Sequence, residues 1–232
     1  MESRTAPRPA LRTVLDGKEI FEQLRIGPER NLAYLIGDVG SGLAALVDPA
    51  YEIDRLLGRV AHHGLRLGYI ITTHSHPDHA GGNIEVRRRT GATVLAASPA
   101  ARALRDFRPV EHGECVALGG SELRFLHTPG HRFDSVCVLV NGRRLMTGDT
   151  LFIGECGRTD LAGSDIDAMW RSLFEVILPL PDHVEIYPGH DYGRAPWATL
   201  GEERKGNYTL APRSLEEFRR FMAEPETHVV FG

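Results

Sequence analysis

Residues 73–79, with the sequence Thr-His-Ser-His-Pro-Asp-His, carry three histidines and one aspartate within six positions. They follow the apolar residues 69–72, which are typical of a buried strand. In an extended chain, residues two positions apart point in the same direction, so His74 and His76 can converge on one point beyond the end of that strand. The alternative is a polar loop that happens to be rich in histidine.

The proline in this segment lets the next side chains join the same group. Proline is accepted in the first turn of a helix, so Pro77 can begin a short helix that carries Asp78 and His79 round to a neighbouring point. Imidazole and carboxylate side chains together bind zinc and non-haem iron well. We therefore expect a transition-metal site just beyond this strand.

Three later segments share one arrangement, in which a metal-binding residue follows a short strand and lies next to a glycine that lets the backbone turn. They are His127-Thr128-Pro129-Gly130-His131, Gly148-Asp149-Thr150 and Tyr187-Pro188-Gly189-His190. One such segment would say little. Four strand ends that bring ligands to one edge of a sheet would form a metal site.

In this order, the motifs HxHxDH, TPGH, GD and PGH resemble those of the metallo-β-lactamase superfamily, from about residue 21 to the C-terminus. The resemblance implies an α/β protein with the metallo-β-lactamase αββα sandwich in a single domain. It also implies two metal positions with an aspartate between them: His74, His76 and His131; Asp78, His79 and His190; and Asp149. The superfamily spans many reactions, so these motifs imply metal dependence without defining the chemistry.

The composition is that of an ordinary globular protein. The chain has 232 residues, of which 42% are hydrophobic and 25% charged, and its net charge of −4 gives no reason to expect nucleic acid or a membrane surface as a partner. Its apolar runs are shorter than the roughly 18 residues of a membrane-spanning helix. The N-terminus lacks the apolar core of a secretory signal and the three cysteines form no paired framework, so we expect a cytoplasmic protein. The sequence is compatible with a homodimer.

Hydrophobic patterning predicts alternating strands and helices. We expect residues 1–15 to form a flexible tail and residues 16–232 to form one domain with a short C-terminal helical extension. Strands are predicted at residues 21–26, 32–36, 44–47, 69–72, 93–96, 123–126, 144–147 and 184–186. Helices are predicted at residues 52–63, 82–90, 165–178 and 214–222, the third with Ser164 as its N-cap.

Two branches of the superfamily that act on glutathione conjugates resemble this chain. Glyoxalase II enzymes hydrolyse hydroxyacylglutathione thioesters at a di-metal centre and carry an additional C-terminal helical domain, whereas persulfide dioxygenases hold one iron and have a shorter extension. About forty residues follow His190 here. Residues 156–160, Cys-Gly-Arg-Thr-Asp, resemble a segment of the dioxygenases. Residues 132–135, Arg-Phe-Asp-Ser, depart from the family, which usually continues Thr-Pro-Gly at this point.

The first hypothesis is a glutathione-dependent persulfide dioxygenase that oxidises glutathione persulfide to sulfite and glutathione. The resemblance implies that His74, His131 and Asp149 are both the catalytic residues and the ligands of one non-haem Fe²⁺. The other four residues would then orient these ligands and tune the metal: His76, Asp78, His79 and His190.

Two residues are candidates for substrate binding. The guanidinium of Arg158 suits bidentate pairing with a substrate carboxylate, and an ion pair with Asp160 or Asp149 is the structural alternative. Tyr192, next to His190 in the sequence, is expected to line the pocket. Cys156 could either pack in the core or line the site.

The second hypothesis is a glyoxalase II-like hydrolase, in which all seven residues hold two metal ions. A hydroxide between the metals would attack the thioester carbonyl, oriented by Asp78. Zn²⁺, one or two ions per chain, is the alternative to iron, because intrinsic affinity favours zinc at histidine-rich sites. A third hypothesis is a metal-binding protein of low activity, against which the full set of ligand-type residues argues.

Overall fold

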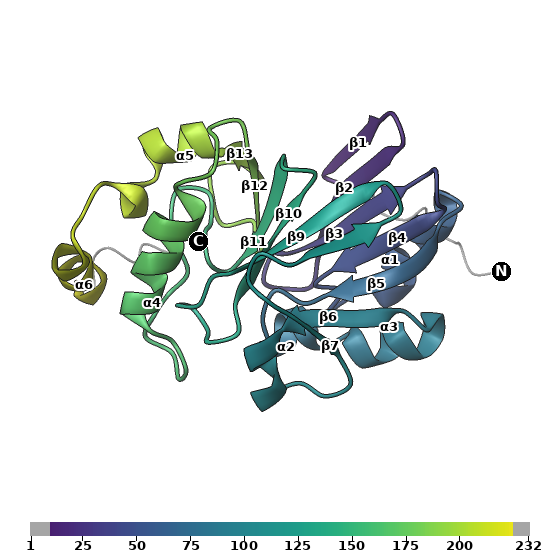
Figure 1. Ribbon diagram of the computed structural model, residues 1–232, viewed down its shortest axis with the longest axis horizontal. Coiled ribbons are helices and arrows are strands. Elements are labelled where there is room, and N and C mark those ends of the chain that lie inside the picture. Colours follow the sequence, from purple (N-terminus) through teal and green to yellow (C-terminus); the bar gives the residue numbers. More distant parts are fainter. Residues whose placement is uncertain (1–9, 225–232) are drawn as a thin grey trace.

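Two β-sheets lie face to face at the centre of the structure, a computed structural model that describes residues 10–224. Helices cover the outer face of each sheet, so that four layers follow in the order helix, sheet, sheet, helix (Figure 1). The predicted α/β sandwich is therefore confirmed. None of the helices within residues 10–224 combines the length and the apolar character needed to cross a membrane.

The first sheet has seven strands, which lie in the order of the sequence. Neighbours from β1 to β4 pair antiparallel, and neighbours from β4 to β7 pair parallel. The strands are β1 (Arg12–Asp16), β2 (Glu19–Ile26), β3 (Asn31–Asp38), β4 (Leu43–Val47), β5 (Arg66–Ile71), β6 (Thr93–Ala97) and β7 (Arg108–Val110).

The second sheet has six strands in the order β13-β12-β11-β10-β9-β8. Its pairs are antiparallel except for β11 and β12, which run parallel. The strands are β8 (Cys115–Leu118), β9 (Ser121–His127), β10 (Val136–Val140), β11 (Arg144–Gly148), β12 (Glu185–Pro188) and β13 (Ala198–Thr199).

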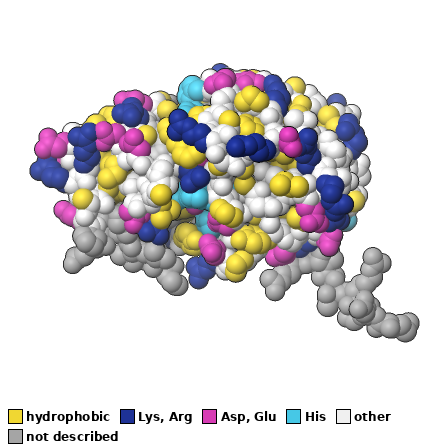
Figure 2. All heavy atoms as spheres, turned by 90° about the horizontal axis from the view of Figure 1, so that it is seen from below, with side chains coloured by type: hydrophobic (Ala, Val, Ile, Leu, Met, Phe, Trp, Pro, Cys, Tyr) yellow, Lys and Arg dark blue, Asp and Glu magenta, His cyan; other side chains and the backbone are white. Residues whose placement is uncertain are grey.

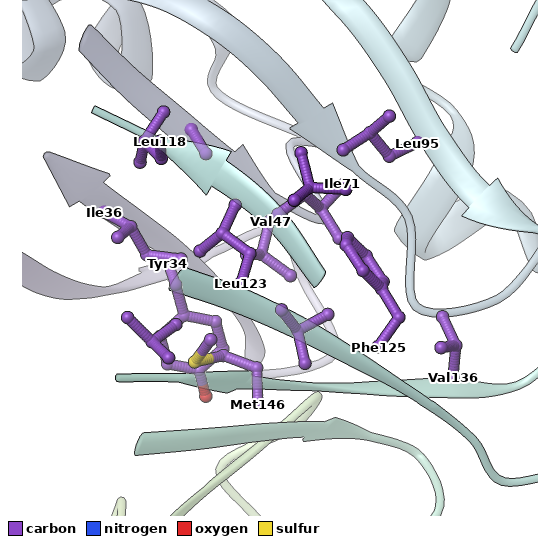
Figure 3. Packing of buried hydrophobic residues seen from close by; sticks show 14 of the residues in the cluster. Tyr34, Ile36, Val47, Ile71, Leu95, Leu118, Leu123, Phe125, Val136 and Met146 are labelled. Carbon is purple, nitrogen blue, oxygen red and sulfur yellow. The ribbon is translucent and has the colours of Figure 1, made fainter. Parts of the chain in front are cut away.

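The main hydrophobic core fills the space between the sheets (Figure 3). Tyr34 and Ile71 of the first sheet meet Phe125, Val136 and Met146 of the second, and all five side chains are buried. Removing each large apolar side chain from water contributes about 1.5–3 kcal/mol, so this core holds the two sheets at a fixed spacing. The loops at the sheet edges are thereby held in fixed positions relative to one another.

Helices α1 (Ile53–His62) and α3 (Asn83–Thr90) cover the first sheet, and Leu56, Val60 and Val86 bury their side chains there. The short helices α2 (Pro77–Ala80) and η1 (Ser98–Arg102) lie beyond strand ends. The second sheet is covered by α4 (Ile166–Arg171), which continues as a wider π-type helix η2 (Ser172–Ile177), and by the C-terminal helices. These are α5 (Leu200–Gly206), η3 (Tyr208–Leu210) and α6 (Leu215–Ala223).

Two details differ from the sequence-based expectations. Residues 12–16 form strand β1, paired with β2 along its whole length, so the predicted tail at residues 1–15 extended too far; residues 1–9 lie outside the described residues. The N-cap of α4 is Asp165, whose carboxylate accepts a hydrogen bond from the Ala168 backbone N–H at 2.9 Å, and not Ser164. The Ser164 hydroxyl instead donates to the Leu161 carbonyl at 2.6 Å, because its side chain closes the preceding turn.

Candidate metal centre

The seven ligand-type residues come together at one edge of the two sheets, although they lie in four separate loops. The loop after β5 and helix α2 supply four of them, and the loops after β9, β11 and β12 supply one each. They form three overlapping groups of close ligand atoms: His74, His76 and His131; His74, His79 and Asp149; and Asp78, His79 and His190. The structure therefore brings together every residue that the motifs suggested as a metal ligand.

The turn between β5 and α2 matches part of the geometry expected from the sequence. His76 is the N-cap of α2 in an extended conformation, with φ −62° and ψ 145°, and Pro77 is the first helical residue. His76 therefore stands in extended backbone just before the helix, and Asp78 and His79 lie in its first turn. His74 differs from the expectation, because it lies in a bend after β5 and not in extended backbone.

The second group has the spacing of a tetrahedral metal site. His79 Nε2 lies 3.2 Å from His190 Nε2 and 3.3 Å from Asp78 Oδ2, and His190 Nε2 also lies 3.3 Å from Asp78 Oδ2. Metal bonds of about 2.0–2.2 Å in a tetrahedron place ligand atoms about 3.3–3.6 Å apart. The three atoms thus have nearly the separations that they would have around one ion.

The first group is slightly more compact. His76 Nδ1 lies 2.9 Å from His74 Nε2 and 3.1 Å from His131 Nε2. Three imidazoles that turn nitrogen atoms toward one point can offer their lone pairs to a single metal ion there. This donor set fits zinc or iron.

Asp149 lies between the two groups. Its Oδ2 is 3.6 Å from His131 Nε2 and 3.5 Å from His190 Nε2, and its Oδ1 is 3.4 Å from His79 Nε2. The Oδ1 atom is buried and has no hydrogen-bond partner within the described residues. A buried carboxylate oxygen without a donor is costly, and a metal ion held by these residues would satisfy it.

The second nitrogen of His74, His79, His131 and His190 lies next to a backbone or side-chain partner. His131 Nδ1 lies 3.0 Å from the Arg158 carbonyl, and His190 Nδ1 lies 2.8 Å from the Glu29 carbonyl. Such contacts fix the tautomer and turn Nε2 toward the centre. The Asn31 amide donates to Asp78 Oδ2 at 3.0 Å and orients that carboxylate in the same way.

Asp48 is a further residue of the site, and the sequence analysis did not identify it. Its Oδ2 lies 2.9 Å from His79 Nδ1 and accepts a hydrogen bond from the Thr73 hydroxyl at 2.6 Å. Its Oδ1 accepts from the Thr73 backbone N–H at 2.8 Å. The buried carboxylate therefore orients His79 and anchors the end of β5 at the same time. Its position directly after the apolar residues 44–47 repeats the strand-end pattern of the other site residues.

The electrostatic field around His190 and Asp149 favours a cation, whereas burial and the neighbouring histidines lower the pKa of His74 and of His76, the latter to about 4. Burial alone would lower the pKa of His190, but the facing carboxylates Asp149 and Asp78 outweigh it and raise the pKa to about 10. Burial would raise the pKa of Asp149, yet His79 and His190 hold it well below its usual range. A field that stabilises an imidazolium also stabilises a metal ion, which must displace the proton in order to bind.

Two glycines are required because the backbone passes close to the ligands. A Cβ atom on Gly189 would collide with Asp149 Oδ1 and lie 2.8 Å from His79 Cε1. A Cβ atom on Gly157 would collide with the Asp149 carbonyl oxygen. At these two positions the motif glycines therefore allow the backbone to pass close to the ligand residues. A larger residue would collide there even if it could adopt the backbone conformation of the turn.

A family model described as the metallo-beta-lactamase superfamily matches residues 26–190, the stretch that holds all seven ligand-type residues. The chain belongs to the metallo-β-lactamase superfamily. Within this superfamily it is 36% identical over 194 residues to the mitochondrial persulfide dioxygenase ETHE1 of Bos taurus, covering 82% of this chain and 74% of the relative. It is 35% identical over 196 residues to a hydroxyacylglutathione hydrolase of Methylococcus capsulatus, covering 83% of this chain and 75% of the relative.

The solved structures agree with this assignment. The crystal structure of ETHE1 from Myxococcus xanthus is similar to this chain with a TM-score of 0.78 at 36% identity, covering 91% of this chain and 94% of that one. The chain therefore lies in the branch of the superfamily that contains both persulfide dioxygenases and hydroxyacylglutathione hydrolases. Relatives of comparable identity divide between the two activities.

The metal-facing residues of this metallo-β-lactamase fold line a cavity of about 700 Å³. A cavity of this size is typical of a site for a small molecule. Histidine and basic side chains come to the surface in a hollow near the middle of the molecule (Figure 2). Phe152 and Leu161 supply apolar parts of the cavity wall, and His76, His131 and Asp149 supply polar parts.

The candidate substrate-binding residues both line this cavity. Tyr192 stacks on His190 with ring centroids 4.7 Å apart and planes 10° apart, and burial raises its pKa to about 12, so it is a neutral hydroxyl. Arg158 forms two 2.7 Å hydrogen bonds with Asp160, and its side chain is 59% exposed. Cys156 is both buried and part of the cavity lining, and burial raises its pKa to about 12.

Proposed function

We propose that this protein is a glutathione-dependent persulfide dioxygenase that converts glutathione persulfide into sulfite and glutathione at one non-haem iron. The reaction uses one dioxygen and one water for each persulfide. The terminal sulfur is oxidised, the sulfur–sulfur bond breaks, and the glutathione sulfur leaves as a thiol. The proposal includes a cytoplasmic location, with which the three free cysteines are compatible.

The main support for the proposal is the position of residues 156–160 next to the metal-facing residues. This is the segment that resembles the Cys-Gly-Arg-Thr-Asp segment of persulfide dioxygenases. Gly157 packs directly against the backbone of Asp149, and the Arg158 carbonyl orients His131 at 3.0 Å. The segment thus supports two of the three proposed iron ligands and forms a wall of the cavity. The similarity to ETHE1 from Myxococcus xanthus over nearly all of both chains also supports it.

The proposed iron ligands are His74, His131 and Asp149, a two-histidine, one-carboxylate set. An iron(II) ion held by these residues would supply the redox chemistry needed to react dioxygen with the persulfide sulfur. The protein itself fixes the ligands: the Arg158 carbonyl holds His131, and Thr73 Oγ1 lies 3.2 Å from His74 Nδ1. His79 and His190 keep Asp149 ionised, because they hold its pKa well below the usual range.

The cavity wall offers both apolar and charged contacts for the glutathione part of the substrate. Phe152 packs edge-on against Tyr192, with centroids 5.5 Å apart, and together they form an apolar wall beside His190. Arg158 lies in the lining and can bind a glutathione carboxylate. Because Arg158 is already paired with Asp160, the substrate has to share or displace that partner, so the gain is smaller than for an unpaired arginine.

An oxygen electrode tests the proposal. Iron-loaded protein supplied with glutathione persulfide should consume oxygen and release sulfite, and Asp149→Ala should abolish both. Arg66→Ala is a suitable control, because this exposed residue begins β5, whose opposite end leads to the site. Oxygen consumption that is equal in the presence and absence of protein would overturn the proposal.

The complete second ligand group favours one other function, hydroxyacylglutathione hydrolysis at two metals. The 3.2–3.3 Å separations among Asp78, His79 and His190 suit a second ion as well as the first group does. A di-metal hydrolase would cleave lactoylglutathione without oxygen, and both His79→Ala and His131→Ala would abolish that cleavage. In the dioxygenase, His131→Ala would remove the bound iron, whereas His79→Ala would leave most of it bound.

A further inference from the structure

A second cavity of about 370 Å³ opens beside the metal-facing cavity, and Tyr192 lines both. The two cavities differ in charge. Five acidic residues line the metal-facing cavity: Glu29, Asp78, Asp149, Glu155 and Asp160. Of the described residues, none that lines the second cavity is acidic, and two are arginines, Arg30 and Arg194.

Arg30 is presented to the second cavity by a backbone tied to the metal centre. Its carbonyl accepts a hydrogen bond from the Asp191 N–H at 3.0 Å, and the preceding carbonyl of Glu29 lies 2.8 Å from His190 Nδ1. Its φ of 58° is unusual for a residue other than glycine, so the chain accepts some strain to place an arginine here. The side chain is exposed, and within residues 10–224 it has no carboxylate at ion-pair distance.

Arg194 is a cation with a fixed position on the opposite wall. Its Nη2 lies 3.1 Å from Glu203 Oε1, and the fully buried Glu203 also accepts hydrogen bonds from the Gly154 N–H and the Asn207 amide, at 2.7 and 2.9 Å. A Cβ atom on Gly206 would lie 3.5 Å from Arg194 Nη1, so the guanidinium lies flat against that glycine. The charge of Arg194 is therefore partly neutralised by Glu203, whereas Arg30 has no such ion pair within residues 10–224.

We propose that the second cavity binds a terminal carboxylate of the peptide thiol whose sulfur reacts in the first cavity, and that Arg30 is its main partner. This inference rests on the proposed function for the identity of the ligand. A substrate that has a reacting sulfur atom and distant carboxylates has parts that favour different cavities. The sulfur belongs in the metal-facing cavity, where Arg158, the one arginine of the described lining, is already paired with Asp160. A carboxylate is favoured more in the second cavity, whose described lining has two arginines and no acidic residue.

The shared wall gives the ligand a path between the cavities. The Tyr192 ring, stacked on His190, belongs to both linings. Tyr208 lines the second cavity and shares a side-chain hydrogen bond with Glu155, which lines the first. Tyr192, and beside it the pair of Tyr208 and Glu155, therefore join the two linings, and the tyrosine hydroxyls can contact a peptide backbone.

Binding without turnover tests this proposal by calorimetry on metal-loaded protein. The ligands are S-methylglutathione, which has no persulfide to oxidise, and two shortened forms that lack either the γ-glutamyl or the glycine residue. Arg30→Ala should weaken S-methylglutathione about fivefold to tenfold, a modest factor because Arg30 is exposed. Arg66→Ala, which removes the same charge at the far end of β5, should change the dissociation constant less than twofold. Arg194→Ala is avoided because it would leave the buried Glu203 without its cation.

The shortened ligands identify the contact. The loss caused by Arg30→Ala should disappear for the one ligand that lacks the bound carboxylate and persist for the other. An equal loss for all three ligands, no loss for any, or no binding of S-methylglutathione to the unmodified protein would overturn the inference. The oxygen assay separates the two proposals. If the protein takes up oxygen but does not show this ligand pattern, only the proposed carboxylate site is wrong. If it shows the ligand pattern but takes up no oxygen, only the dioxygenase proposal is wrong.

Discussion

Asp48→Asn is the substitution that most sharply tests how the metal centre is held. Asp48 is 3% exposed, and its two oxygens contact Thr73 and His79 through three contacts of 2.6–2.9 Å. Asparagine keeps the shape but loses the charge and replaces one acceptor oxygen with an N–H donor. Its single oxygen cannot serve the Thr73 N–H, which meets Oδ1, and also the Thr73 hydroxyl and the His79 ring, which both meet Oδ2. Asparagine therefore loses either the anchor on Thr73 or the acceptor for His79, and in both orientations the negative charge beside His79 is gone.

The expected cost falls on the second metal position. Replacing a residue that orients a metal-binding histidine lowers metal affinity about 10–100-fold, which corresponds to roughly 1.4–2.7 kcal/mol. The titration uses Zn²⁺, which suits both ligand groups even though the proposed enzyme uses one iron. The zinc affinity of the position formed by Asp78, His79 and His190 should weaken by this factor, and that of the position formed by His74, His76 and His131 should weaken less. Competition with a chromophoric chelator in the absence of oxygen measures both affinities in one titration.

Asp38→Asn is the matched control. Asp38 is 4% exposed and accepts hydrogen bonds from the Ser41 and Gly120 N–H groups at 2.7 and 2.8 Å, at the end of β3 away from the metal-binding loops. Both variants should lose about 1–3 kcal/mol of stability, because each weakens a buried network. Only Asp48→Asn should lose metal. An unchanged second affinity in Asp48→Asn, or the same loss in Asp38→Asn, would refute the role assigned to Asp48.

Three further predictions follow from particular contacts. His131→Ala should remove bound iron while His79→Ala leaves most of it, as measured by metal analysis after anaerobic purification; equal loss in both contradicts one-iron binding. Arg158→Ala should raise KM up to about tenfold with iron content unchanged, because its pairing with Asp160 limits the gain from substrate; an unchanged KM removes Arg158 from the site. Glu22→Gln should lower stability by about 2 kcal/mol near neutral pH. Burial would raise the pKa of Glu22, but hydrogen bonds from Arg59 and His63 hold it below 4.5, so this difference is full above pH 4.5 and fades as the pH falls further. Denaturant titrations at several pH values measure it, and a difference that grows in acid contradicts the sign.

The parts of the site that are local in sequence could be predicted from the sequence. His74, His76 and His79 owe their arrangement to one strand end and one helical turn, and both follow from the apolar residues before them and from Pro77. The positions of His131, Asp149 and His190 required the family resemblance. The sequence shows that each follows a strand, but not that these strands end at the same edge.

The remaining features depend on contacts between segments far apart in the sequence. Asp48 contacts residues 25 and 31 positions away, so no local period identifies it. The carbonyls of Glu29 and Arg158 orient ligands through backbone atoms, which carry no residue-specific signal. Strand β1 has mostly exposed side chains and lies at the edge of its sheet, so it lacks the apolar pattern that marks buried strands.

The ratio of oxygen consumed to sulfite formed, measured on iron-loaded protein with glutathione persulfide, tests the central claim most directly. We predict one oxygen molecule for each sulfite, with Asp149→Ala at the rate of the reaction without protein. A preparation that consumes no oxygen, yet cleaves lactoylglutathione under anaerobic conditions, would contradict the assignment and identify a hydrolase.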